Sequence, residues 1–186
     1  IDIYFARANI LHKEEKFEES SKILKLANKL KLDIHPSNPD QLIKKSKFLL
    51  LESYTEKENF KIYKDYPQSI FIVGMPRSGS TLIESILSMN SDVNDLGEIN
   101  ILEESFLEWK KTDKKAKLTE IYQEKININE KSKITTNKWL YNYQYTGIIA
   151  QNILNVKIIY CFRHPLDNIL SIYRAHFSKG NQYSSS

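Results

Sequence analysis

Residues 74–82 combine two glycines, three hydroxyl side chains and one arginine in the order Gly-Met-Pro-Arg-Ser-Gly-Ser-Thr-Leu. Glycine lets a backbone turn sharply and approach an anion closely, and Gly74 and Gly79 are separated by four residues. If a helix begins near Gly79, the backbone N–H groups of residues 79–82 point at phosphate-like oxygens. The segment is therefore predicted to be an anion-binding loop.

The cation of this loop lies inside the turn, at Arg77. A nucleotide-binding P-loop carries a lysine directly before its Ser or Thr, and Ser80 stands at that position here. Without that lysine the loop is poorly suited to the β- and γ-phosphates of ATP. An arginine can instead fork onto one terminal tetrahedral anion. The alternative is a strand–turn–helix link with an exposed arginine and no ligand.

A second candidate anion site follows the apolar run 156–162. Arg163 comes where this predicted strand leaves the sheet, and open α/β sheets bind ligands at the carboxyl ends of their strands. Ser171 lies eight residues later, about two turns into a helix that Pro165 opens. P-loop NTPases place a Mg²⁺-binding Asp after such a strand, so an arginine indicates metal-free nucleotide binding. The alternatives are an ion pair of Arg163 with Asp167 and a surface hydroxyl at Ser171.

These two segments together resemble the sulfotransferases that use PAPS (3′-phosphoadenosine 5′-phosphosulfate). Residues 76–82 look like the family's 5′-phosphosulfate loop, and Arg163 with Ser171 is similar to its 3′-phosphate site, including the spacing. The run that begins at Arg163 is similar to bacterial sulfotransferases fused to tetratricopeptide (TPR) repeats, which are related to tyrosylprotein sulfotransferases. The resemblance covers about residues 67–178 and, more weakly, 1–35.

The resemblance implies roles for the matching residues. Those that would bind the cofactor are Arg77, Ser78, Gly79, Ser80 and Thr81 at the 5′-phosphosulfate and Arg163 and Ser171 at the 3′-phosphate. Glu98 matches the general base of tyrosylprotein sulfotransferases. Lys138, after Asn137, matches a lysine that reaches the transferring sulfuryl group. Such a carboxylate takes the proton of a weakly nucleophilic hydroxyl, while Arg77 and Lys138 offset developing negative charge without a metal.

Other roles for these two residues, and the acceptor, stay open. Glu98 could instead stabilise the start of a helix expected over residues 98–109, and Lys138 could be an ordinary surface lysine. In tyrosylprotein sulfotransferases, arginines after the catalytic Glu grip an acidic peptide, whereas Ile99 and Asn100 stand here. The expected acceptor is therefore a hydroxyl of a protein, protein tyrosine included, a glycan or a small molecule, with PAP (3′-phosphoadenosine 5′-phosphate) as the other product.

Strands and helices alternate from residue 67 onward. The expected strands are 69–73, 133–136 and 156–162, the first and last of them buried, and the expected helices are 81–89, 98–109, 114–125, 143–154 and 166–177. This alternation predicts an α/β fold with a P-loop-like parallel sheet and flanking helices.

Residues 1–66 contain no glycine and have the pattern of helices. Apolar residues recur at helical spacing on both sides of a polar link at 12–16, which predicts a helical hairpin, and a further helix is expected over 41–60. The hairpin resembles one TPR repeat, which implies a peptide partner and more repeats upstream. The expected domains are therefore a TPR-like region at 1–66 and the N-terminal part of a sulfotransferase domain at 67–186.

Composition limits the other functions. The 186 residues are 41% hydrophobic and 27% charged, which is typical of a globular protein. No run approaches the ~20 apolar residues of a membrane span, no signal sequence is visible, and Cys161 is the single cysteine. Together these features favour the cytoplasm. The net charge of +4 comes from interleaved Lys and Glu, which predicts solvated helix faces and does not require nucleic acid.

The ends of the chain predict an incomplete domain, because it starts at Ile1 and ends in three serines. On its own it is expected to bind PAPS weakly and to be inactive. Two other functions stay open. A nucleotide kinase with a degenerate P-loop predicts Mg²⁺-dependent ATP binding. A TPR-type interaction module on an inactive nucleotide fold predicts a peptide partner at residues 1–66 and indifference to Arg77→Ala.

Overall fold

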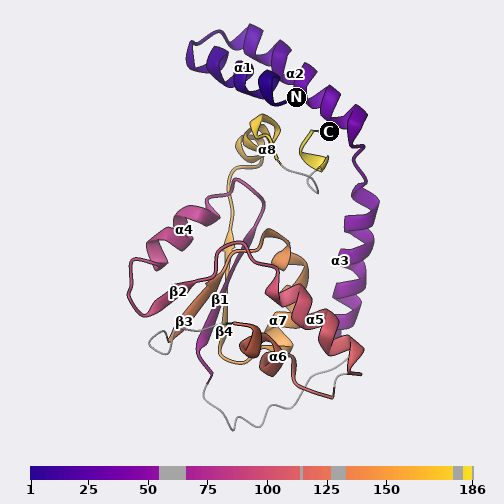
Figure 1. Ribbon diagram of the computed structural model, residues 1–186, viewed down its shortest axis with the longest axis vertical. Coiled ribbons are helices and arrows are strands. Elements are labelled where there is room, and N and C mark those ends of the chain that lie inside the picture. The colour runs from indigo at the N-terminus through magenta and orange to yellow at the C-terminus, as the bar shows by residue number, and fades with distance from the viewer. Residues whose placement is uncertain (55–65, 114, 127–132, 178–181, 186) are drawn as a thin grey trace. The chain divides into compact units, whose positions relative to one another are not determined.

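The computed structural model describes residues 1–54, 66–113, 115–126, 133–177 and 182–185. The elements in chain order are α1 (Asp2–Lys13), α2 (Phe17–Ile34), α3 (Pro39–Tyr54), β1 (Gln68–Gly74), α4 (Ser80–Leu87), β2 (Val93–Asp95), α5 (Ile101–Lys111), α6 (Leu118–Lys125), β3 (Ile134–Asn137), η1 (Leu140–Tyr145), α7 (Thr146–Asn152), β4 (Val156–Cys161), α8 (Pro165–Arg174) and η2 (Gln182–Ser185) (Figure 1). The chain divides into two compact units, Ile1–Ile43 with Arg163–Ser186, and Lys44–Phe162. Each unit is described by itself.

The unit Lys44–Phe162 is built on a four-stranded sheet in the order β2-β3-β1-β4. All three pairings are parallel, and β1 lies inside the sheet, between β3 and β4. Its burial follows from this position, because both neighbouring strands and the helices on both faces cover it. The structure thus confirms an α/β fold with a parallel sheet and flanking helices. Since the strands are parallel, the loops after β1, β2 and β3 all leave from one edge.

Alternation along β1 divides the core between the two faces of the sheet. Ile70 and Ile72 pack with Ile83 and Leu87 of α4. Phe71 and Val73 point the other way, as the period of two in a strand requires. Figure 1 accordingly shows α4 on one side of the sheet and α5 to α7 on the other.

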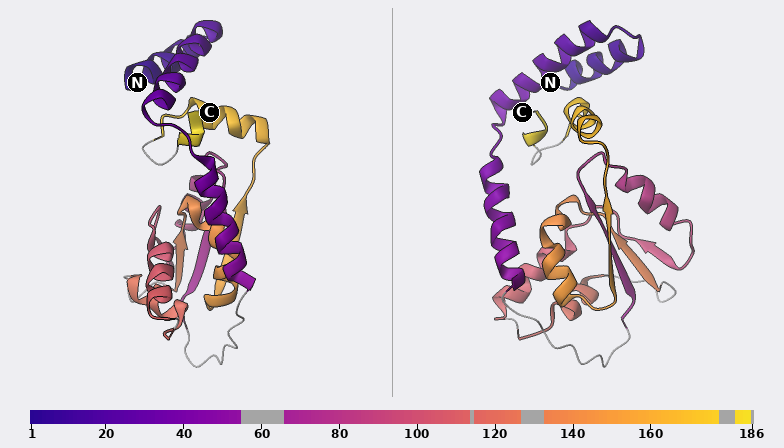
Figure 2. Two further views of the ribbon diagram at one scale, coloured as in Figure 1. Left: turned by 90° about the vertical axis from the view of Figure 1, so that its right-hand side faces the viewer. Right: turned by 180° about the vertical axis from the view of Figure 1, so that it is seen from behind.

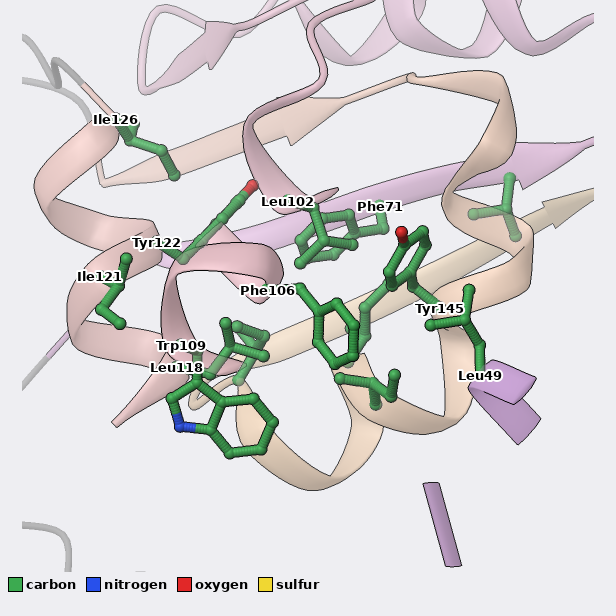
Figure 3. Close-up of a cluster of buried hydrophobic side chains, with 14 residues drawn as sticks. Leu49, Phe71, Leu102, Phe106, Trp109, Leu118, Ile121, Tyr122, Ile126 and Tyr145 are labelled. Atoms are coloured by element: carbon green, nitrogen blue, oxygen red, sulfur yellow. The ribbon is translucent and has the colours of Figure 1, made fainter. Parts of the chain in front are cut away.

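The larger half of the core is aromatic. Figure 3 shows its side chains pointing toward one another from several elements. The ring centroids of Phe71 in β1 and Tyr122 lie 5.4 Å apart, and those of Phe106 in α5 and Tyr145, which meet edge-on, lie 5.5 Å apart. Leu49 of α3 is buried in the same cluster. Fully burying each such side chain contributes roughly 1.5–3 kcal/mol to the free energy of folding. Because the cluster joins side chains of the helices to those of β1, this burial holds the helices against the sheet.

The other unit joins the N-terminal hairpin to the C-terminal segment. As predicted, α1 and α2 form a hairpin, and they run side by side in both views of Figure 2. Small residues let them approach, and the Ser20 hydroxyl donates to the Ala8 carbonyl at 2.7 Å. Tyr173 of α8 packs on the apolar cluster of this hairpin, and its carbonyl accepts a hydrogen bond from Asn28 at 3.1 Å. Part of the hairpin surface is therefore covered by α8 of the same chain.

The strand β4 differs from its prediction. Residues 156–162 were expected to be a buried strand, but Lys157, Ile158 and Tyr160 are exposed. The physical reason is the strand order: β4 pairs with β1 on one side, and no strand that the structure describes lies on its other side. An apolar run indicates a strand but does not tell a central position from an edge.

One helix boundary and one short strand also differ from prediction. The helix expected over 98–109 begins at Ile101, so Glu98 lies outside it. The short strand β2 was not predicted, because three residues of mixed polarity carry no periodic signal. Of the helix expected over 41–60, residues 55–60 lie outside the described part of the chain. Within the described ranges, no helix combines the length and apolar composition needed to cross a bilayer.

Candidate functional site

The loop between β1 and α4 turns through three residues with positive φ. These are Gly74 at +150°, Arg77 at +67° and Gly79 at +99°. The turn is closed by the Ser78 N–H, which donates to the Met75 carbonyl at 3.2 Å. A left-handed arginine costs free energy, and such strain is concentrated at ligand-binding loops. Arg77 therefore has a backbone conformation that local sterics disfavour, and its side chain is exposed to solvent.

The polar groups of this loop fit a tetrahedral anion. The Ser78 Oγ is buried and has no hydrogen-bond partner among the described residues. In the first turn of α4, the N–H of Ile83 is the first to reach a helix carbonyl, that of Gly79, at 3.2 Å. The preceding N–H groups of residues 80–82 have no intrahelical acceptor, as at every helix N-terminus. An anion with several oxygens would satisfy both the hydroxyl and these N–H groups.

A buried lysine lies between two carboxylates at the same edge of the sheet. Lys138 follows the last residue of β3, and its side chain is only 5% exposed. Its Nζ lies 2.6 Å from Glu98 Oε1 and 3.7 Å from Glu84 Oε2. Glu98 comes from the loop after β2, and Glu84 from α4, the helix that the anion-binding loop opens. The family resemblance implied a site role for Glu98 and another for Lys138, and the structure places their side chains in contact.

Backbone pairing beyond the strands sets this contact. The Leu96 N–H donates to the Thr136 carbonyl and the Lys138 N–H to the Gly97 carbonyl, both at 2.9 Å. These two hydrogen bonds extend the pairing of β2 with β3 beyond Asp95 and Asn137, the last residues of the two strands. Gly97 has a φ of +63°, which turns the chain so that Glu98 lies beside Lys138.

Asn137 fixes the backbone around the pair from inside the protein. Its Nδ2 donates to the Ile99 carbonyl at 3.3 Å. Its Oδ1 accepts from the Trp139 N–H at 3.0 Å and from the Asn142 side chain at 2.8 Å. One buried amide thus holds the loop of Glu98 to the residues that follow Lys138.

Glu84 is a site residue that sequence reasoning missed. It lies one turn after Ser80 and next to Ile83, which packs against the sheet, so its carboxylate is buried. Burial raises the pKa of Glu84, and the nearby Lys138 opposes that shift. A signal was present, since an acid on the sheet-facing side of an apolar helix needs a partner. The sequence did not say which cation that partner is.

Arg163 and Ser171 belong to the other unit. Arg163 is exposed and precedes α8, where His164 occupies the N-cap and Pro165 the first helical position. Ser171 is half-buried on α8. That they join the anion-binding loop in one site stays a prediction. Among the residues that the structure describes, no three His, Cys, Asp or Glu side chains are grouped to hold a metal ion.

Comparison with known proteins adds an independent finding. The model of a family described as "Sulfotransferase family" matches residues 67–186. An uncharacterized protein of Aquifex aeolicus (strain VF5) is 28% identical over 130 residues, which cover 59% of this chain and 17% of that protein. The chain thus spans less than a fifth of the length of that relative. No solved structure matches the chain.

Proposed function

Because this chain belongs to the sulfotransferase family, we propose that its protein transfers a sulfuryl group from PAPS to an acceptor hydroxyl. The observation that carries the proposal is the 2.6 Å contact between Lys138 and Glu98. It places a cation and a carboxylate together at the carboxyl edge of the sheet, where the loop after β1 also begins. Sulfuryl transfer needs both, one for the transferring group and one for the acceptor proton.

The anion-binding loop supplies the proposed binding site for the 5′-phosphosulfate. Arg77, the hydroxyls of Ser78, Ser80 and Thr81, and the N–H groups that begin at Gly79 would share its oxygens. The buried Ser78 hydroxyl without a partner among the described residues supports this role, since a buried donor left unsatisfied is costly. Arg163 and Ser171 are proposed to bind the 3′-phosphate.

PAPS supplies an activated sulfuryl group: the acceptor oxygen bonds to sulfur as the bond between sulfur and the 5′-phosphate oxygen breaks, and PAP leaves. In this reaction Glu98 takes the proton of the acceptor hydroxyl. Lys138 and Arg77 offset the negative charge that grows on the sulfuryl and bridging oxygens. Glu98 suits its role because its side chain is 52% exposed and can turn toward an incoming acceptor.

The acceptor belongs to the proposal as a hydroxyl of a protein, a glycan or a small molecule. Ile99 and Asn100, which follow Glu98, lead into α5: the Ile99 carbonyl accepts from Asn137, and the Asn100 carbonyl accepts from the Glu104 N–H at 3.2 Å. An acidic peptide would meet no arginine at these two positions. Protein tyrosine therefore stays one acceptor among several.

The N-terminal hairpin is proposed to be a TPR-like unit with a structural task. Its apolar cluster carries Tyr173, and Phe5 stacks on His176 at 4.7 Å. We propose that the main task of the hairpin is to hold α8, the helix that bears Ser171. We further propose that a peptide partner binds on the remaining surface of the hairpin. The division into domains at residues 1–66 and 67–186, and a cytoplasmic location, stay predictions.

Thermal unfolding of the full-length protein with PAP, with ATP and Mg²⁺, and without ligand tests the proposal. A ligand that binds the folded state alone, at a hundred times its Kd, raises the unfolding midpoint by about 5 °C. We expect this rise with PAP and not with ATP and Mg²⁺, and we expect Arg77→Ala to abolish it. A folded protein that PAP does not stabilise would overturn the proposal. A rise with ATP and Mg²⁺ alone would favour a kinase.

A further inference from the structure

We propose that Glu84 is a positioning residue of the sulfuryl-transfer site: it is the fixed carboxylate that keeps Lys138 in place while Glu98 leaves it to act as a base. The inference rests on the proposed function and adds a residue to it. It starts from the arrangement of one buried ammonium between two carboxylates, at 2.6 and 3.7 Å.

The two carboxylates differ in their freedom. The Glu84 side chain is 9% exposed and the Glu98 side chain 52%. Glu84 is further held by α4 and by the Thr136 hydroxyl, which donates to its Oε1 at 3.4 Å. Glu98 is on a loop. A movement of one partner away from Lys138 is therefore a movement of Glu98.

Such a movement needs a second carboxylate. In the contact observed, Glu98 Oε1 accepts a hydrogen bond from the Lys138 ammonium, so this oxygen must leave the ammonium before it can accept a proton from a hydroxyl. If no other anion were near, Lys138 would then be a buried cation without a partner, which is strongly unfavourable. Glu84, on the other side of the ammonium, removes that penalty. Glu84 thus lowers the free-energy cost of releasing Glu98, while Lys138 stays in place.

Glu84 has no evident value for stability alone. Its burial raises its pKa, which means that the folded protein disfavours the ionised form. Ionisable groups kept in such positions are concentrated at functional sites. Glu84→Gln keeps the shape of the side chain, and Lys138 still has Glu98. We therefore expect this variant to fold as well as the wild type at pH 8.

The test compares Glu84→Gln with wild type in the full-length protein, by the turnover of PAPS in the presence of an acceptor. We expect kcat to fall about tenfold, because Lys138 then holds Glu98, while the KM for PAPS changes less than twofold. The unfolding midpoint at pH 8 should stay equal or rise. Glu104→Gln, the same change at an exposed site on α5, is the matched control and should leave all three values unchanged.

A readout without turnover tests the pairing itself. Lys138→Met leaves Glu84 buried without its cation and should lower the unfolding midpoint at pH 8. Adding Glu84→Gln to this variant should recover at least half of that loss. An unchanged kcat in Glu84→Gln, or no recovery in the double variant, would overturn the inference and leave the proposed function standing. A wild-type protein that neither binds PAP nor consumes PAPS would overturn both.

Discussion

Gly74, the last residue of β1, lies so close to Cys161, the last residue of β4, that a Cβ at position 74 would overlap the Cys161 carbonyl oxygen. The parallel pairing of the two strands brings these backbones together, and Gly74 also has a φ of +150°. We predict that Gly74→Ala destabilises the protein by about 2 kcal/mol or more, through backbone strain and overlap together. Urea unfolding measures the loss.

The control for this change is Gly79→Ala. Gly79 has a φ of +99°, but a Cβ there would meet no atom within 4 Å. It should therefore cost only the backbone strain, about 1 kcal/mol. Equal losses in the two variants would show that the contact with Cys161 carries no weight. A second measurement is the rate at which the Cys161 thiol is alkylated. Burial raises the pKa of this thiol, which makes it unreactive in the wild type. Displacement of the Cys161 backbone in Gly74→Ala should expose the thiol and raise the rate.

The raised pKa of Glu84 predicts how stability depends on pH. The groups that act on it are Lys138, Asp95, Thr136 and Glu98, and burial is the largest influence. Between its ordinary pKa of 4.5 and its raised pKa, the folded protein binds a proton that the unfolded chain has lost. Stability from this group is therefore full below pH 4.5 and is lost as the pH rises through the raised pKa.

Glu84→Gln removes this titration. The unfolding free energy of the variant, minus that of the wild type, should become more positive as the pH rises from 4 toward 8. Denaturant unfolding of both proteins across this range measures the difference. A difference that moves in the opposite direction would mean that the folded protein favours the ionised carboxylate.

Asn137 should be essential for the geometry of the site. Asn137→Ala removes the hydrogen bonds to Ile99, Trp139 and Asn142 and leaves their buried groups without this partner. We predict a loss of about 2–3 kcal/mol in stability and weaker activity, because the backbone around Glu98 and Lys138 loosens. Gln68→Ala, which removes one exposed hydrogen bond of 3.5 Å, should change stability by less than about 0.5 kcal/mol. Comparable losses in both variants would contradict this role.

Much of the fold could be predicted from local patterns. The strand before the glycine loop, the helix after it and the N-terminal hairpin follow from apolar periodicity and turn residues, and the structure confirms them. The exposure of β4 could not be predicted, because an apolar run looks the same at the centre and at the edge of a sheet. The start of α5 at Ile101 was also missed, since the turn at Gly97 and its bonds to β3 depend on strand pairing.

The candidate site divides in the same way. Arg77, Glu98 and Lys138 were proposed from motifs, but the role of each is still to be tested. The contact between Glu98 and Lys138 joins residues 40 positions apart, and that between Glu84 and Lys138 joins residues 54 apart. Neither distance can be read from spacing along the chain. Glu84 was missed because its burial depends on how α4 lies on the sheet.

What the sequence by itself determined is local: a glycine loop between a strand and a helix, one arginine within it, and hydroxyls around it. These features depend on steric freedom and hydrogen-bonding groups of neighbouring residues. Only the tertiary structure decided that one ammonium lies between a buried carboxylate, Glu84, and a half-exposed one, Glu98. The physical reason is that parallel pairing brings the ends of β1, β2 and β3 to one edge, whatever their separation in the chain.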